Sequence, residues 1–224
     1  MNFSKQQEVS IQAIISEVKK QLAEAEGGHD WWHILRVWKN AQLICKKEEV
    51  DRYVVELAAL LHDIADAKFH DGNEDIGPER ALRILETYKV GNNTIEHVIS
   101  IIKNMSFKNS FERRGFDSPE MRVLQDADRL DAIGAIGIAR TFSYGGYKGH
   151  PFMDPNIAPI NHDSKASYKQ STAPTINHFY EKLLLLKEGM HTQTAKVMAE
   201  ERHDYMLGFL NQFYKEWGDR PEWG

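Results

Sequence analysis

Leu60-Leu61-His62-Asp63-Ile64-Ala65-Asp66 places an adjacent His–Asp pair in an otherwise apolar segment of the chain. Burying two ionisable side chains among leucine, isoleucine and alanine costs several kcal/mol unless a partner compensates. A divalent cation compensates well, so the pair predicts half of a metal site. We expect His33, which closes the stretch 29–33, and Asp128, which closes Asp126-Ala127-Asp128, to supply the other half.

Apolar residues recur at helical spacing along most of the chain, as in the stripe formed by Ile11, Ile14, Ile15 and Val18. Alternation with a period of two residues is nowhere sustained, so strands are not expected. The sequence therefore predicts an all-α fold. The expected helices cover residues 9–22, 30–44, 51–65, 78–85, 94–103, 119–141, 175–187 and 192–217.

No change in composition marks a linker, so residues 1–224 are expected to form one domain. The predicted metal-site core covers about 27–142, and the C-terminal helices cover about 175–217. Between them, residues from about 143 to 173 are rich in Gly, Pro, Asn and Ser and predict one long irregular loop. Loops of this length in a compact domain are often lids or binding loops.

Composition narrows the class of protein. A net charge of −5 argues against a platform for nucleic-acid polymers, and the single Cys45 cannot form an internal disulfide. The N-terminus has no apolar signal core, and no run approaches the roughly 20 apolar residues of a membrane-spanning helix. We therefore expect a cytoplasmic protein without a membrane partner, and the sequence leaves monomer and homodimer equally open.

The ligand types indicate the metal. Imidazole and carboxylate together suit Mn²⁺, Fe²⁺, Co²⁺, Ni²⁺ and Zn²⁺, whereas Mg²⁺ and Ca²⁺ favour oxygen almost alone. We expect one divalent transition ion, with Mn²⁺ first and Mg²⁺ as an open alternative. Four protein ligands on an ion that accepts about six leave room for water, whose pKa the ion lowers toward neutrality. That chemistry predicts a hydrolase.

Two neighbouring side chains are candidate catalytic residues. Asp66 follows Asp63 by three positions and His62 by four, so on a continuing helix it would share their face and accept a proton from the water. Arg36 stands three positions after His33, where its planar fork of donors could hold a phosphate.

The order His33, then His62-Asp63, then Asp128, on a helical background, resembles the HD superfamily of metal-dependent phosphohydrolases, in which these positions are the metal ligands. The stretches 29–37 and 126–142 are similar to short, stand-alone bacterial members of that superfamily. One Bacillus type among them cleaves nucleoside triphosphates to monophosphate and pyrophosphate. The resemblance covers most of the chain and implies an HD-domain helical bundle.

The same resemblance implies a role for Asp66. In related bacterial deoxynucleotidases, an acidic residue three positions after the HD aspartate is the catalytic acid/base. This chain has the shorter Asp there instead of Glu.

Four further residues are candidates for substrate contact. His29 lies four positions before His33, at the expected rim of the site, and metal ligation is its alternative role. His97 lies where two-metal members of the superfamily place an additional histidine, with a core or pocket-wall role as the alternative. Lys68 and Lys148 could bind phosphate, Lys148 from a glycine-rich loop, and solvated surface lysines are the alternative.

These observations lead to a metal-dependent phosphohydrolase acting on a nucleotide phosphate ester or anhydride, with nucleoside triphosphate pyrophosphohydrolase as one form. The alternatives are a nucleoside monophosphate phosphatase, a cyclic-nucleotide phosphodiesterase or, in another class, a metal-dependent nucleotide-binding sensor. Oxygenase chemistry would need histidine ligands beyond His97. No sequence feature distinguishes purine from pyrimidine, ribose from deoxyribose, or mono- from triphosphate.

Overall fold

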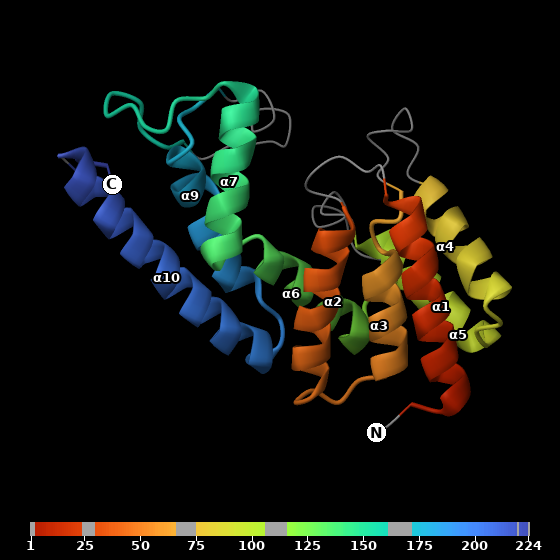
Figure 1. Ribbon diagram of the computed structural model, residues 1–224. Helices are drawn as coiled ribbons and strands as arrows, with labels where there is room; N and C mark the ends of the chain where they lie inside the picture. The colour runs from red at the N-terminus through yellow and green to blue at the C-terminus, as the bar shows by residue number, and fades with distance from the viewer. Residues whose placement is uncertain are drawn as a thin grey trace. The chain divides into compact units, whose positions relative to one another are not determined.

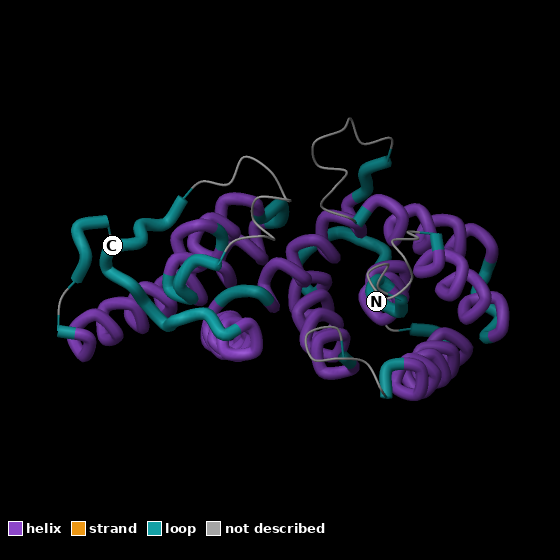
Figure 2. Tube along the Cα trace, turned by 90° about the horizontal axis from the view of Figure 1, so that it is seen from above, coloured by secondary structure: helices purple, strands orange, loops and turns teal. Residues whose placement is uncertain are grey.

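The computed structural model describes residues 3–23, 30–65, 75–105, 116–160, 172–218 and 220–223. Across these residues it contains helices and loops and no strand, which confirms the predicted all-α fold (Figure 2). None of the helices in the described ranges has the length and apolar character needed to cross a membrane. The helices are α1 (Lys5–Gln21), α2 (Trp31–Cys45), α3 (Arg52–Leu61), α4 (Ile76–Thr87), α5 (Asn92–Asn104), α6 (Pro119–Asp131), α7 (Gly134–Lys148), α9 (Asn177–Glu181), the 3-10 helix η3 (Leu183–Gly189) and α10 (Gln193–Trp217).

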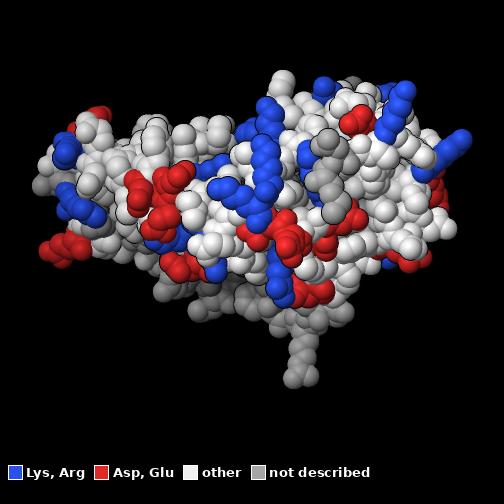
Figure 3. Space-filling model, turned by 90° about the horizontal axis from the view of Figure 1, so that it is seen from below, with Lys and Arg blue, Asp and Glu red and all other residues white. Residues whose placement is uncertain are grey.

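Contacts divide the chain into two compact units, Met1–Asp128 and Arg129–Gly224. The expectation of a single domain over 1–224 stays a prediction. On the face shown in Figure 3, acidic and basic side chains are interspersed.

Helix α3 is the centre of the first unit. It packs against α1, α2 and α5, and α1, α2 and α3 lie side by side in Figure 1. Every residue from Tyr53 to Leu61 is buried, as expected for a helix that is apolar on all sides apart from Glu56. Asp51 begins this helix by accepting hydrogen bonds from the backbone N–H groups of Tyr53 and Val54. The end of α3 is therefore held inside the core.

One buried carboxylate ties α2 to α3. Glu56 on α3 is 1% exposed. Its oxygens accept hydrogen bonds from Trp38 Nε1 at 2.8 Å and Gln42 Nε2 at 3.0 Å, both on α2, and from Arg52 Nε at 2.6 Å. A buried carboxylate is tolerated only when its lone pairs are satisfied, and here three donors satisfy them. The cluster fixes how α2 lies along α3.

The second unit is built around α7 and α10, which pack against each other (Figure 1). Four phenylalanine rings, Phe142, Phe179, Phe209 and Phe213, join α7, α9 and α10, and Phe179 stacks on Phe209 with centroids 5.8 Å apart. Thr192 caps α10 by accepting from the Ala195 N–H. Aromatic packing thus links these three helices.

Three predicted boundaries differ from the structure. The helix expected over 51–65 ends at Leu61, with His62 as its C-cap. The helix expected over 119–141 is two helices, α6 and α7, and α7 begins at Gly134 with φ +75°, which favours glycine. The helix expected over 175–187 is divided at Lys182 into α9 and η3.

The predicted loop also begins later than expected. Helix α7 continues to Lys148, so the irregular segment starts at Gly149, which ends the helix in the left-handed conformation at φ +70°. Glycines that indicated a loop lie inside this helix. Gly145 is needed there because a Cβ at that position would lie 2.3 Å from Thr175 Oγ1. Close packing of two segments, and not a turn, explains this glycine.

We expect Glu56→Ala to lower the free energy of unfolding by about 1.5–3 kcal/mol, because it removes a charged acceptor from two donors on α2. Glu79→Ala is the matched control, since Glu79 also pairs with an arginine four residues away but its side chain is 64% exposed. The control should change stability by less than about 0.5 kcal/mol. Urea unfolding followed by circular dichroism measures both, and equal effects would contradict the role given to Glu56.

Candidate metal centre

His33 is positioned by the first turn of α2. Asp30 caps this helix, and its carboxylate accepts a hydrogen bond from the His33 backbone N–H at 2.9 Å. This cap sets where the helix begins and hence which way residue 33 points. The His33 side chain is 4% exposed, so its imidazole lies in the core of the first unit.

His62 is positioned by the end of α3. Its Nδ1 lies 2.9 Å from the Ala59 carbonyl oxygen, one turn earlier. Because a carbonyl only accepts, this contact requires the proton on Nδ1 and leaves the lone pair on Nε2. Nε2 is buried, and no described residue gives it a hydrogen bond. A metal ion binds a histidine through a nitrogen whose lone pair carries no proton, and the hydrogen bond at Nδ1 leaves Nε2 in that state.

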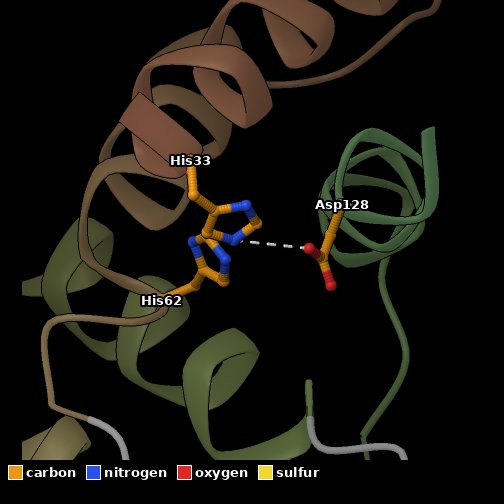
Figure 4. Close-up of side chains that lie close together, drawn as sticks. All are labelled: His33, His62 and Asp128. Atoms are coloured by element: carbon orange, nitrogen blue, oxygen red, sulfur yellow. Dashed lines mark ion pairs between the residues drawn. The ribbon is translucent and has the colours of Figure 1, made fainter. Parts of the chain in front are cut away.

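The predicted ligands come together in space. One ligand atom each from His33, His62 and Asp128 lie within 4.8 Å of one another (Figure 4). His33 Nε2 is 3.6 Å from Asp128 Oδ1 and 3.7 Å from Asp63 Oδ2. Two ligands that are each about 2.1 Å from one ion lie roughly 3–4 Å apart. The spacing and the donor types therefore fit a divalent cation.

The two sides of this cluster differ in exposure. The His33 side chain is 4% exposed, whereas the Asp63 and Asp128 side chains are 23% and 44% exposed. The imidazole side is therefore fixed within the core, and the carboxylate side is open. An ion held here would keep open coordination positions for water or a substrate oxygen, as catalytic metal sites do.

Of the other predicted residues, Arg36 shares a helix with a clustered residue and His97 does not. Arg36 lies on α2 one turn after His33 and is half-buried. His97 on α5 is outside the cluster. Its Nε2 lies 3.0 Å from Ser118 Oγ and 3.5 Å from Glu120 Oε2, which are contacts of a pocket-wall or core residue. Substrate contact by His97 stays a prediction.

Lys148 does not lie in a loop. It occupies the last turn of α7, and its Nζ lies 5.3 Å and 5.7 Å from the ring centroids of Tyr147 and Tyr144. It belongs to the second unit, whereas the His33 cluster belongs to the first. The idea of a glycine-rich loop carrying this lysine was wrong, because the glycines are helical. Phosphate contact by Lys148 stays a prediction.

Asp66, Lys68 and His29 lie outside the described residues. Helix α3 ends at Leu61, so helical spacing does not place Asp66 on one face with His62 and Asp63. The role of Asp66 as a proton acceptor stays a prediction that now depends on the family resemblance alone.

Sequence reasoning missed one buried polar residue near the cluster. Asn40 is 6% exposed, and its Nδ2 donates to the backbone carbonyl of Ala127 at 3.2 Å. The sequence feature that could have indicated it is an amide in the mostly apolar stripe of α2, seven positions after His33.

Comparison with known proteins finds one matching family model and a similar bacterial protein. The family model of the HD domain matches residues 31–133, a range that includes all four clustered residues. The YpgQ protein of Bacillus subtilis (strain 168) is 40% identical over 200 residues, which cover 89% of each chain.

Two solved structures are similar in fold and in sequence. A crystal structure of an HD-superfamily hydrolase from Bacillus thuringiensis has a TM-score of 0.77 at 43% identity, covering 96% of this chain and 100% of that one. The crystal structure of Bacillus subtilis YpgQ in complex with ADP has a TM-score of 0.74 at 36% identity, covering 97% and 98%. The similarity therefore extends over nearly the whole chain and not only over the clustered residues.

We expect Mn²⁺ to stabilise the protein through His62. At a Mn²⁺ concentration about a hundred times Kd, binding should add about 2.7 kcal/mol to the free energy of unfolding. His62→Leu should abolish this gain and change the stability of the metal-free protein little, because it removes the buried unpartnered Nε2 as well as the Nδ1 hydrogen bond to Ala59. Thermal unfolding with Mn²⁺ or with excess chelator measures both quantities.

The matched control is His150→Leu in the second unit, which should keep the full gain from Mn²⁺. The same gain in His62→Leu as in the wild-type protein would show that His62 is not a ligand.

Proposed function

Because the chain belongs to the HD superfamily of hydrolases, we propose that it is a metal-dependent phosphohydrolase that acts on a phosphate ester or anhydride of a nucleotide. The observation that carries the proposal is the convergence of His33, His62 and Asp128, with the His62 Nε2 lone pair buried and without a partner among the described residues. Family membership alone would leave the chemistry open. The cluster supplies the ligands that a metal-dependent reaction needs.

Four residues are proposed to hold the ion: His33, His62, Asp63 and Asp128. When bound, a divalent ion lowers the pKa of a coordinated water and withdraws charge from a phosphoryl oxygen. The chain's own contribution is to fix these ligands. The Ala59 carbonyl holds the His62 ring in one tautomer, and the Asp30 cap sets the start of the helix that carries His33.

Arg36 is proposed to hold the reacting phosphate. It lies one turn along α2 from His33, and its guanidinium offers donors in a planar fork that fits two phosphate oxygens. Asp66 is proposed to accept a proton from the attacking water, as the corresponding acidic residue does in the related deoxynucleotidases. The open carboxylate side of the cluster gives a phosphate access to a bound ion.

A nucleotide is the substrate class that the relatives support. Bacillus subtilis YpgQ has been solved in complex with ADP, so a protein that matches this chain over nearly its whole length binds a nucleoside diphosphate. We propose triphosphate cleavage as the main reaction. In it, the oxygen of water bonds to the α-phosphorus while the bond to the bridging α–β oxygen breaks, which yields a nucleoside monophosphate and pyrophosphate.

We expect the Mn²⁺-loaded protein to convert nucleoside triphosphates to monophosphate and pyrophosphate, and excess chelator to stop the reaction. Product analysis by anion-exchange chromatography over a panel of mono-, di-, tri- and cyclic nucleotides is the measurement. Asp63→Asn should lose activity because it removes a proposed ligand charge, whereas Asp204→Asn, an exposed residue on α10, should not.

The panel also separates the alternatives. Release of inorganic phosphate and nucleoside from monophosphates would indicate a phosphatase instead. Tight nucleotide binding without turnover of any panel member, in protein shown to contain metal, would contradict an enzymatic role.

A further inference from the structure

The helix that carries His33 makes a second contact with the helix that carries Asp128. Asn40 lies seven positions after His33 on α2, which is two helical turns and returns to the same face. Both residues are buried, with exposures of 3% and 6%. Asn40 Nδ2 donates to the carbonyl oxygen of Ala127 at 3.2 Å. Ala127 directly precedes Asp128, so this bond meets α6 beside the metal cluster.

Two contacts on one face hold a neighbouring helix better than one. His33 faces the Asp128 side chain at 3.6 Å, and Asn40 holds the backbone one residue earlier. The first contact lies at the start of α2 and the second lies two turns further along. Together they restrict both the sliding of α6 across α2 and its rotation about its own axis, the two motions that would move the Asp128 carboxylate away from His33.

A buried amide at position 40 gives α2 a contact that an apolar residue would not give. Its neighbours on the buried face of α2 are the apolar residues Val37, Ala41 and Ile44, all fully buried. An amide among them must be hydrogen-bonded to avoid a desolvation penalty, and an apolar residue would pack there without one. The amide instead gives a directional contact, which apolar packing does not provide.

We propose that Asn40 is a positioning residue of the metal centre, holding the backbone of α6 so that the Asp128 carboxylate stays opposite His33. This inference rests on the proposed function, since it takes the His33, His62 and Asp128 cluster to bind a divalent ion. Asn40 touches neither the ion nor the substrate, and it acts through the backbone of Ala127.

Helix α2 itself offers the matched control. Gln42 is also an amide on α2 that bridges to another helix, but its Nε2 donates to Glu56 on α3 and not to α6. Asn40→Leu and Gln42→Leu therefore each remove one hydrogen bond that an amide of α2 donates to another helix, the first to a backbone carbonyl and the second to a carboxylate. Only the first removes a contact beside a proposed ligand.

The experiment is calorimetric titration of the full chain with Mn²⁺ alone. We expect Asn40→Leu to weaken Mn²⁺ binding by about 10-fold to 100-fold, the usual effect of losing a group that orients a metal ligand. Gln42→Leu should change the affinity by no more than about twofold, because Trp38 still joins α2 to Glu56 and the contact between α2 and α6 is intact. Urea unfolding of the metal-free variants, measured in parallel, reports any general loss of stability.

Asn40→Asp is the second variant, because it keeps the shape of the side chain but replaces the amide donor with a carboxylate, which only accepts and so cannot donate to the Ala127 carbonyl. It should weaken Mn²⁺ binding in the same direction, and it decides the result if Asn40→Leu does not fold. Wild-type affinity in a folded Asn40 variant, or an equal loss in Gln42→Leu, would overturn the inference and leave the proposed function intact. Absence of Mn²⁺ binding in the wild-type protein would overturn both.

Discussion

The hydrogen bond between the His62 ring and the Ala59 carbonyl determines what the metal cluster can do. It occupies Nδ1 at 2.9 Å and therefore leaves Nε2 with a lone pair and no proton. That nitrogen is buried and lacks a hydrogen-bond partner among the described residues, a state that costs free energy in a metal-free protein. A cation relieves this cost, so the fold stores part of the binding energy of the ion in one unsatisfied atom.

Polar contacts elsewhere in the first unit position the other proposed ligands near that nitrogen. Glu56 ties α2 to α3 and so sets His33 against the end of α3, where His62 stands. Asn40 ties α2 to α6 and so sets His33 against Asp128. Polar contacts on two sides of α2 thus fix its position between α3 and α6. Packing of leucines and isoleucines alone would define that position less sharply.

The sequence predicted those features that depend on local pattern. Helical periodicity predicted α2, α5 and α10 to within a few residues, because their apolar stripes are regular and their starts at Asp30 and Thr192 are ordinary caps. The cluster of His33, His62 and Asp128 was predicted because buried ionisable residues require partners, and few partners suit two histidines and a carboxylate.

Features that depend on contacts between distant segments were not predicted. The stretch Gly145-Gly146 favoured a loop, but it is helical, and residue 145 is a glycine because Thr175 packs against it. The break between α6 and α7 has no proline to signal it, and Arg202 from α10 donates to the Leu130 carbonyl at that point. The contact of Asn40 with Ala127 joins residues 87 positions apart, so no local pattern could reveal it.

We propose that one divalent ion is held by His62 Nε2 together with His33, Asp63 and Asp128. A crystal structure of the protein soaked in Mn²⁺, with anomalous diffraction recorded at the manganese edge, tests it most directly. We expect one anomalous peak about 2.0–2.3 Å from His62 Nε2, from His33 and from carboxylate oxygens of Asp63 and Asp128. A structure in which the peak lies elsewhere, or in which His62 Nε2 donates a hydrogen bond to another group of the protein, would contradict it.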